Sequence, residues 1–377
     1  MAKALATYLC SAQHPTTGLV ESFATSADPR LNGVAFTYDL ALASLVFSHH
    51  QRLEEARRLL QLYREMPFPN TSTFAFNVAY QIELGLPTLE YVFQGGPLFW
   101  IALALMRYAE ATGNPSDLQR ALELLEWART QLGHFRGGVV MGTQKPWNGL
   151  MSVENNWAYY AALRLAIQHL PEGPMRTAFL EEKREVRQWL SRNERNRGEG
   201  DPVKALDVYT NALLVGPEAH LEDGTFGDQH HLAKWAKDMV AELEALFRIP
   251  DSPRYDYTDQ PEAARIGRDR AGWLEGTEQV VLAYQTWAPF FEAIGDSAFA
   301  RELRLRAALA HAHVIRNSLF AKNSVAIPNT DASEPIRTFA DGWYARPWSE
   351  PALNSTTWTY FAEVGYNPFT TALPRAE

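Results

Sequence analysis

Hydrophobic and polar positions along the chain separate two kinds of helical segment. Apolar residues fill most positions of the segments that start near residues 35, 97, 152, 203, 273 and 351. Between them lie amphipathic, charge-rich segments at 51–65, 114–132, 174–193, 229–247 and 297–317. A helix that is apolar all round is surrounded by protein, whereas an amphipathic helix exposes one face to water. The pattern therefore predicts alternating inner and outer helices, with little strand structure.

Six apolar helices that alternate with an amphipathic set have a closed arrangement, the (α/α)6 toroid. We predict an all-α fold of this class, built as one domain over residues 1–377. A solenoid of helix pairs is the competing layout, but no fixed repeat period runs through the sequence. Long segments at 67–96, 133–151, 249–272 and 321–350 are rich in aromatic residues, glycine and proline. Because loops of this length are usually functional, we expect them to form an ordered rim at one mouth of the toroid.

Four presumed inner helices begin with a carboxylate next to an aromatic side chain. The carboxylates are Asp39, Glu154, Asp207 and Glu275, and their aromatic neighbours are Tyr38, Trp157, Tyr209 and Trp273. In a toroid these helix starts point into one cavity. Glycoside cleavage needs one protonated and one ionised carboxyl group, and aromatic rings offer flat faces to a sugar. The pattern predicts a sugar-cleaving site with these four carboxylates as catalytic candidates.

A second interpretation of the same carboxylates is helix chemistry, because acidic side chains cap helix N-termini and favour their positive end. Glu275 is the strongest catalytic candidate, since it precedes Gly276. A glycine near a helix start is costly unless something must approach closely. Glu278 lies on nearly the same face as Glu275. It is an alternative carboxylate, or a like-charged neighbour that favours the protonated form of Glu275.

Amide, aromatic and basic side chains near the helix starts and in the long loops are candidates for sugar binding. Beyond the aromatic neighbours above and Glu278, they are Trp147, Asn155, Asn156, Gln279, Trp343 and Arg346. Trp147 would cover a bound ring. Arg346 would pair with Asp341 or bind an acidic substrate.

Composition excludes several other functions. A net charge of −9 and a pI near 5.6 argue against a nucleic-acid partner, which needs a concentrated basic face. Cys10 is the single cysteine, so a disulfide framework and a cysteine metal site are ruled out. No nucleotide-binding glycine loop or His-Glu-x-x-His motif occurs, and we predict neither cofactor nor metal. Without a signal peptide or a membrane-length apolar run, we expect a cytoplasmic protein with no membrane partner.

Six stretches spread along the chain share features of one known group: residues 13–20, 36–42, 152–160, 273–277, 357–361 and 365–369. They resemble bacterial (α/α)6 carbohydrate-active, glycosidase-like proteins. In such families acidic residues at inner-helix starts line the substrate cavity. By position, the resemblance implies this role for Asp39, Glu154, Asp207 and Glu275.

The residues and the resemblance together predict a glycoside hydrolase, inverting, that cleaves a bacterial oligo- or polysaccharide. We expect Glu275 as general acid, Glu154 or Asp207 as general base, and Asp39 as a ligand of substrate or water. Two alternatives stay open. A sugar epimerase or isomerase of the same shape would use histidines near neutral pH and requires His231 or His311 to face the cavity. A carbohydrate-binding toroid would keep the aromatic rim without catalysis.

Overall fold

The computed structural model describes residues 1–67, 76–88, 93–201, 203–321, 323–339 and 344–371. The chain divides into two compact units. The N-terminal unit is Ala6–Asn193, and the C-terminal unit combines Met1–Leu5 with Glu194–Glu377. Helix α1 (Ala2–Ser11) contributes residues to both. The prediction of a single domain over the whole chain stays a prediction.

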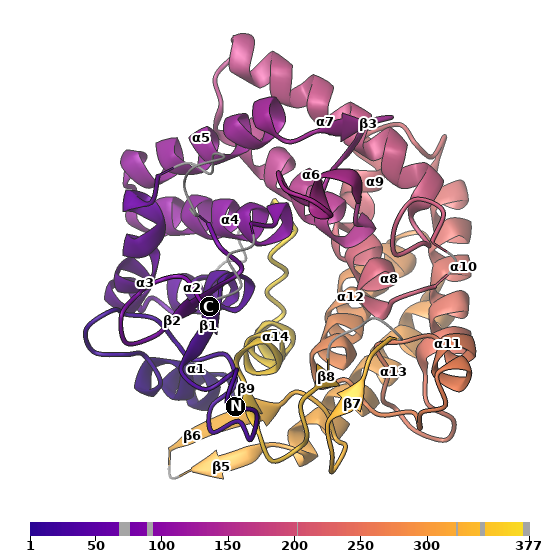
Figure 1. The fold of residues 1–377 in the computed structure, drawn as a ribbon. Coiled ribbons are helices and arrows are strands. Elements are labelled where there is room, and N and C mark those ends of the chain that lie inside the picture. The colour runs from indigo at the N-terminus through magenta and orange to yellow at the C-terminus, as the bar shows by residue number, and fades with distance from the viewer. Residues whose placement is uncertain (68–75, 89–92, 202, 322, 340–343, 372–377) are drawn as a thin grey trace. The chain divides into compact units, whose positions relative to one another are not determined.

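The N-terminal unit has an inner and an outer set of helices (Figure 1). The inner helices α2 (Thr37–His49), α4 (Gly95–Thr112) and α6 (Val153–His169) pack in that order. The outer helices α3 (Leu53–Glu65), α5 (Pro115–Gln131) and α7 (Pro174–Asn193) cover α2, α4 and α6 respectively. Helix α3 buries only Ala56, Leu59, Leu60 and Tyr63, which is one helical stripe, whereas α2 buries every residue from Asp39 to Ser48. The core of this unit lies between the two sets.

Short antiparallel strands position the inner-helix starts of this unit. Strand β1 (Val34–Phe36) pairs with β2 (Ala79–Gln81), with Phe36 opposite Ala79, and runs directly into α2. Strand β3 (His134–Phe135) pairs with β4 (Gly138–Val139) ahead of α6. A 3₁₀ turn, η1 (Trp147–Gly149), lies between β4 and α6.

The C-terminal unit repeats the helical arrangement. The buried helices are α8 (Leu206–Leu214), α12 (Leu274–Ala293) and α14 (Leu353–Val364), and α12 packs against both of the others. The outer helices α10 (Gln229–Phe247) and α13 (Ser297–Arg316) cover α8 and α12. Two short helices, α9 (Gly216–Glu222) and α11 (Gln260–Arg265), complete the set.

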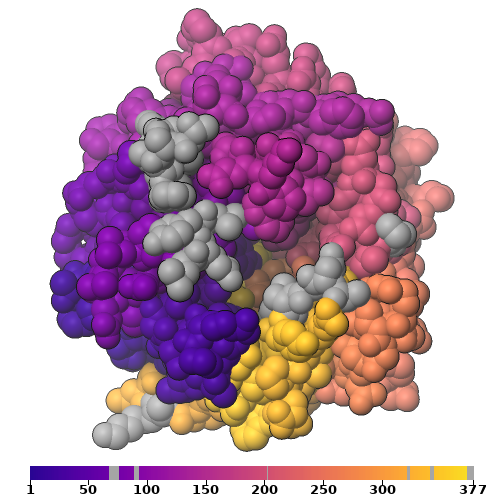
Figure 2. Space-filling model, in the orientation of Figure 1, coloured from indigo at the N-terminus to yellow at the C-terminus, as the bar shows by residue number. Residues whose placement is uncertain are grey.

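Small sheets again lead into the buried helices of the C-terminal unit. Strands β5 (Leu319–Ala321), β6 (Ser324–Pro328) and β9 (Pro351–Ala352) form an antiparallel sheet in that order, and β9 continues into α14. Strands β7 (Ile336–Arg337) and β8 (Tyr344–Ala345) pair as a hairpin. On the face shown in Figure 2, the yellow segment around β7 and β8 adjoins the orange segment of the same unit. The hydrogen bond from Thr258 Oγ1 to the Thr338 carbonyl ties these segments together.

The helical pattern of the sequence is confirmed nearly to the residue. The five predicted outer segments correspond to α3, α5, α7, α10 and α13, with ends that differ by at most two residues. The predicted inner segments correspond to α2, α4, α6, α8, α12 and α14. The long segments that we expected to be an ordered rim hold six of the short strands of the described residues: β2, β3, β4, β6, β7 and β8. Within the described residues, no helix is both long enough and apolar enough to cross a lipid bilayer.

Candidate functional site

None of the four candidate carboxylates caps its helix. The N-cap residues are Phe36 for α2, Ser152 for α6, Ala205 for α8 and Trp273 for α12. At α6 the Ser152 hydroxyl accepts the hydrogen bond that a cap provides. All four carboxylates stand in the first turn, where they still interact favourably with the helix dipole. Capping therefore does not explain them.

Asp207 and Glu275 begin two helices that pack against each other, α8 and α12. Their side chains are buried, with 7% and 3% exposed. The Thr210 hydroxyl on α8 donates to Gln279 Oε1 on α12 at 2.7 Å, and Gln279 Nε2 lies 3.4 Å from Glu275 Oε1. This chain of polar groups joins the two helix starts. The Gln279 amide thus orients Glu275. Thr210, which lies on the same helix as Asp207, holds the Gln279 amide in turn.

Gly276 is required because Trp273 covers the first turn of α12. A Cβ atom at position 276 would lie 2.1 Å from Cε3 of Trp273 and 2.8 Å from Cδ2 of Leu206. The close approach predicted at Gly276 is therefore made by the protein's own indole ring. Trp273 is 4% exposed, and its Nε1 has no hydrogen-bond partner among the described residues.

Sequence reasoning missed Tyr257, which is not on a helix. It lies in the loop before α11, between Tyr255 and Thr258, which each form an isolated β-bridge. Its hydroxyl donates to Asp207 Oδ2 at 3.2 Å, and its carbonyl accepts from the Leu206 backbone N–H. Its ring meets the Trp273 ring edge-on at 4.7 Å and the Phe339 ring at 5.2 Å. The sequence signal was the Tyr-Asp-Tyr run at 255–257. It places aromatic residues next to a carboxylate, as the helix starts do, but within a loop.

Three predicted binding residues of the C-terminal unit have other partners. Tyr209 donates to Glu242 Oε1 on α10 at 2.7 Å. Glu278 faces α13, where both its oxygens lie 2.9 Å from His311 Nδ1. Arg346 is buried in a bidentate ion pair with Glu350, at 2.7 Å for both contacts. These side chains serve the packing of the unit, and Asp341 and Trp343 fall outside the described residues.

In the N-terminal unit, Asp39 is the candidate with the most unusual environment. Only 2% of it is exposed. Burial raises the pKa of Asp39 to about 7, and a hydrogen bond with Ser22 opposes part of this shift. Asp39 therefore keeps its proton in weakly acidic solution, where an exposed aspartate is ionised. Tyr38 beside it is half-buried and meets Trp100 edge-on at 5.5 Å.

The adjacent amides Asn155 and Asn156 have different surroundings. Asn156 Oδ1 accepts from the Val139 backbone N–H, while its Nδ2 donates to the Val139 and Ser152 carbonyls. Asn156 therefore fastens β4 to α6 and has no amide group left for a ligand. Asn155 lies over Gly96, where a Cβ atom would approach its Oδ1 to 2.2 Å. Its buried Nδ2 has no partner among the described residues, so Asn155 retains a donor for a ligand.

The remaining predicted residues of this unit divide between surface and core. Glu154 and Trp147 are half-buried. Trp157 is fully buried, and the Arg187 guanidinium lies 5.3 Å from its ring centre. Trp157 is thus a core residue rather than a sugar platform.

The histidines that an epimerase would need are engaged elsewhere. His231 is exposed on α10 and pairs with Asp228 at 3.0 Å. His311 on α13 lies between Glu278 and Glu363, each at 2.9 Å. Burial alone would lower the pKa of His311, but these two carboxylates raise it to about 9. Across the residues that the structure describes, no group of three or more His, Cys, Asp or Glu could hold a metal ion.

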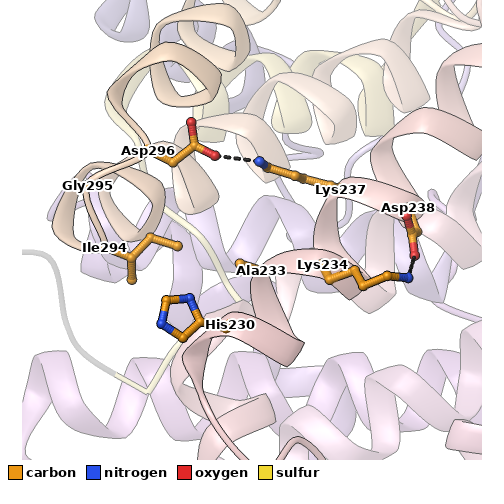
Figure 3. A pocket seen from close by; sticks show the side chains of 8 residues that line it. All are labelled: His230, Ala233, Lys234, Lys237, Asp238, Ile294, Gly295 and Asp296. Carbon is orange, nitrogen blue, oxygen red and sulfur yellow. Dashed lines mark hydrogen bonds and ion pairs between the residues drawn. The ribbon is translucent and has the colours of Figure 1, made fainter.

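An open pocket of about 510 Å³ lies at a different place in the C-terminal unit (Figure 3). It is lined by the start of α10 and by Ile294, Gly295 and Asp296, which follow the last turn of α12. Lys237 and Asp296 form an ion pair across it at 2.5 Å. Because Glu275 stands in the first turn of α12, this pocket is not the site of the candidate carboxylates.

Neither the protein-family models nor the sequences of curated proteins give a match to this chain. Solved structures do match it over nearly the whole length. A cellobiose 2-epimerase from Spirochaeta thermophila has a TM-score of 0.66 at 14% identity, covering 97% of this chain and 94% of that one. A cellobiose 2-epimerase from Bacillus thermoamylovorans gives 0.64 at 11% identity, covering 95% of both chains. A wild-type glycosidase gives 0.61 at 13% identity, covering 97% of this chain and 96% of that one.

At these identities the likeness shows the fold. The chain is an all-α protein of the (α/α)6 toroid class, which confirms the predicted fold class. The same fold carries glycosidases and sugar epimerases among the matching structures, including a glycosidase variant in complex with glucose. Fold alone does not choose between these activities, so the choice depends on the residues of this chain.

Proposed function

We propose that this protein is a glycoside hydrolase whose general acid is Glu275 and whose general base is Asp207. The observation that carries the proposal is the placement of both buried carboxylates at the starts of adjoining helices, joined through Thr210 and Gln279. Glycoside hydrolysis uses two carboxyl groups, one to protonate the leaving oxygen and one to activate water. The substrate we propose is an oligo- or polysaccharide, in keeping with the sugar enzymes that share the fold.

In the proposed reaction, the protonated carboxyl of Glu275 gives its proton to the glycosidic oxygen as the bond from the anomeric carbon to that oxygen breaks. The Asp207 carboxylate takes a proton from a water molecule that attacks the anomeric carbon from the opposite face. The product is a free sugar with inverted anomeric configuration. Glu275 ends ionised and Asp207 ends protonated, so a proton exchange with solvent resets the pair.

The surroundings of the histidines favour hydrolysis over epimerisation. Epimerisation requires abstraction of a proton next to a carbonyl, and a pair of histidines suits this acid–base step near neutral pH. The two histidines that this chemistry would require lie on the outer helices α10 and α13. There His231 pairs with Asp228, and His311 pairs with Glu278 and Glu363.

The test is a glycan screen scored for released reducing sugar, followed by proton NMR of the first anomer formed. Glu275→Gln and Asp207→Asn should each lower kcat/KM by about 10²–10⁴-fold, the usual contribution of a general acid or base. Glu292→Gln is the matched control, because Glu292 stands on the same helix but is exposed and pairs with Arg304. It should retain wild-type activity.

The outcomes separate the candidate functions. Release of sugar that persists in Glu275→Gln would refute the assigned general acid. Conversion of a reducing disaccharide into its isomer without cleavage would identify an epimerase instead. Saturable sugar binding with neither reaction would point to a binding protein.

A further inference from the structure

The loop that precedes α12 brings Tyr257 to Asp207. The Tyr257 hydroxyl lies 3.2 Å from Asp207 Oδ2. The backbones of the two segments are paired as well. The Leu206 N–H donates to the Tyr257 carbonyl, and Ala205 forms a β-bridge with Thr258. This backbone pairing fixes the position of Tyr257 relative to Ala205 and Leu206, the two residues that immediately precede Asp207.

Asp256 holds this loop in place. Its buried carboxylate accepts five hydrogen bonds, two from Arg268, one from Arg270, and one each from the Ala271 and Thr258 backbone N–H groups. Asp256 and Thr258, the residues on either side of Tyr257, are thus both held by hydrogen bonds to the Asp256 carboxylate. A site group whose own supports are fixed holds its geometry closely.

The Tyr257 ring is also confined. It is packed between Trp273, at 4.7 Å and nearly perpendicular, and Phe339, at 5.2 Å. With the ring fixed by these contacts, the hydroxyl has little freedom to leave Asp207 Oδ2. Tyr257 remains half-buried, so one side of it is open to solvent or a ligand.

We infer that Tyr257 is a positioning residue for Asp207: its hydroxyl holds Oδ2 of the proposed general base in place. This inference rests on the proposed function. A hydroxyl that donates to a carboxylate also favours its ionised form, which is the form that accepts a proton from water. Loss of the hydroxyl would remove this support of the carboxylate and make Asp207 easier to protonate.

Tyr257→Phe is the test variant, because it removes the hydroxyl and keeps the ring packing. The expected result is a fall in kcat of about tenfold with KM within about twofold, the size of one lost hydrogen bond to a charged group. The acid limb of the pH–rate profile should move to higher pH, because Asp207 must be ionised to act as base. A merely structural role would not move that limb.

Tyr255→Phe is the matched control from the same loop. The Tyr255 hydroxyl donates to Glu244 Oε1 on α10 at 2.6 Å, and Tyr284 donates to the same oxygen at 2.6 Å. The control therefore loses a tyrosine hydroxyl two residues away without touching Asp207. It should leave the acid limb unchanged.

A measurement that needs no activity separates this inference from the proposed function. The titration of the Asp207 carboxyl carbon, followed by ¹³C NMR and assigned with Asp207→Asn, should shift to higher pH by about one unit in Tyr257→Phe and not in Tyr255→Phe. An unshifted curve in Tyr257→Phe would overturn the inference about Tyr257. A shifted curve in a protein that hydrolyses no glycan would sustain the Tyr257–Asp207 coupling and overturn the hydrolase proposal.

Discussion

The indole of Trp273 lies directly against the backbone of Gly276, so that a Cβ atom at position 276 would stand 2.1 Å from ring atom Cε3. The two residues flank Glu275, and the ring shape therefore fixes the first turn of α12 around the proposed acid. Any side chain at position 276 must displace either the ring or the helix.

Gly276→Ala should therefore destabilise the protein by about 1–3 kcal/mol, the usual cost of overpacking a buried site, and should lower glycan hydrolysis as well. Urea unfolding followed by circular dichroism measures the first effect. Gly227→Ala is the control, because a Cβ atom at position 227 meets nothing within 4 Å. A Gly276→Ala protein as stable as the control would contradict the close contact.

The buried carboxyl of Asp39 predicts a pH dependence of folding. Its pKa is raised by burial from 3.8 to about 7, so between these values the folded state keeps a proton that the unfolded state has released. Stability contributed by this group therefore falls as the pH rises from 3.8 to about 7 and stays low above it.

Asp39→Asn should remove that slope and make the protein more stable than wild type at pH 8, as measured by urea unfolding at a series of pH values. Asp228→Asn makes the same chemical change at an exposed helix cap whose pKa is lowered, so it should leave the slope in place. Parallel pH curves for wild type and Asp39→Asn would show that Asp39 is ionised in the folded protein.

His311 predicts a slope at higher pH. Burial disfavours its charge, but Glu278 and Glu363 more than compensate and raise its pKa to about 9. A folded-state pKa above the ordinary 6.5 gives stability that is complete below 6.5 and is lost as the pH rises to about 9. His311→Gln should cost about 3–5 kcal/mol at pH 6, since it leaves Glu278 buried without its cation, and much less at pH 9.5. Thermal unfolding at both pH values, with the exposed His230→Gln as control, tests this; an equal loss at both values would contradict it.

The neighbouring amides of α6 should respond in opposite ways. Asn156→Ala strips partners from the backbone of Val139 and should cost about 2–4 kcal/mol, through two or more buried groups left unpaired. Asn155→Ala removes a side-chain donor that has no protein partner among the described residues, so stability should change by less than about 1 kcal/mol. If Asn155 binds substrate, KM rises in that variant alone. Urea unfolding and steady-state kinetics on both variants measure the contrast.

The sequence predicted the helices well because the burial of a helix determines how apolar residues are spaced along it. An outer helix such as α3 alternates buried and exposed residues at helical spacing, and an inner helix such as α2 does not. The same spacing located the helix starts and therefore the carboxylates near them. It did not predict the direction in which each neighbouring side chain points.

Helical geometry explains the misassigned neighbours. Successive residues turn by about 100°, so Tyr209 points roughly 200° away from Asp207 and reaches α10 instead. Glu278 was expected to share a face with Glu275, but His311 on α13 attracts it. Tyr257 was missed because its position depends on backbone pairing with Ala205 and Leu206, about fifty residues earlier, and no local pattern encodes such a contact.

The five hydrogen bonds gathered on Asp256 also bear on ligand affinity. A loop that becomes ordered only when its ligand arrives weakens binding by the conformational entropy lost at that moment. Here the segment that carries Tyr257 is ordered when the chain folds, by arginines and backbone groups that a ligand need not touch. Binding at this end of α8 therefore begins from an arranged surface, and affinity there should depend on the fit of the ligand more than on induced ordering of the loop.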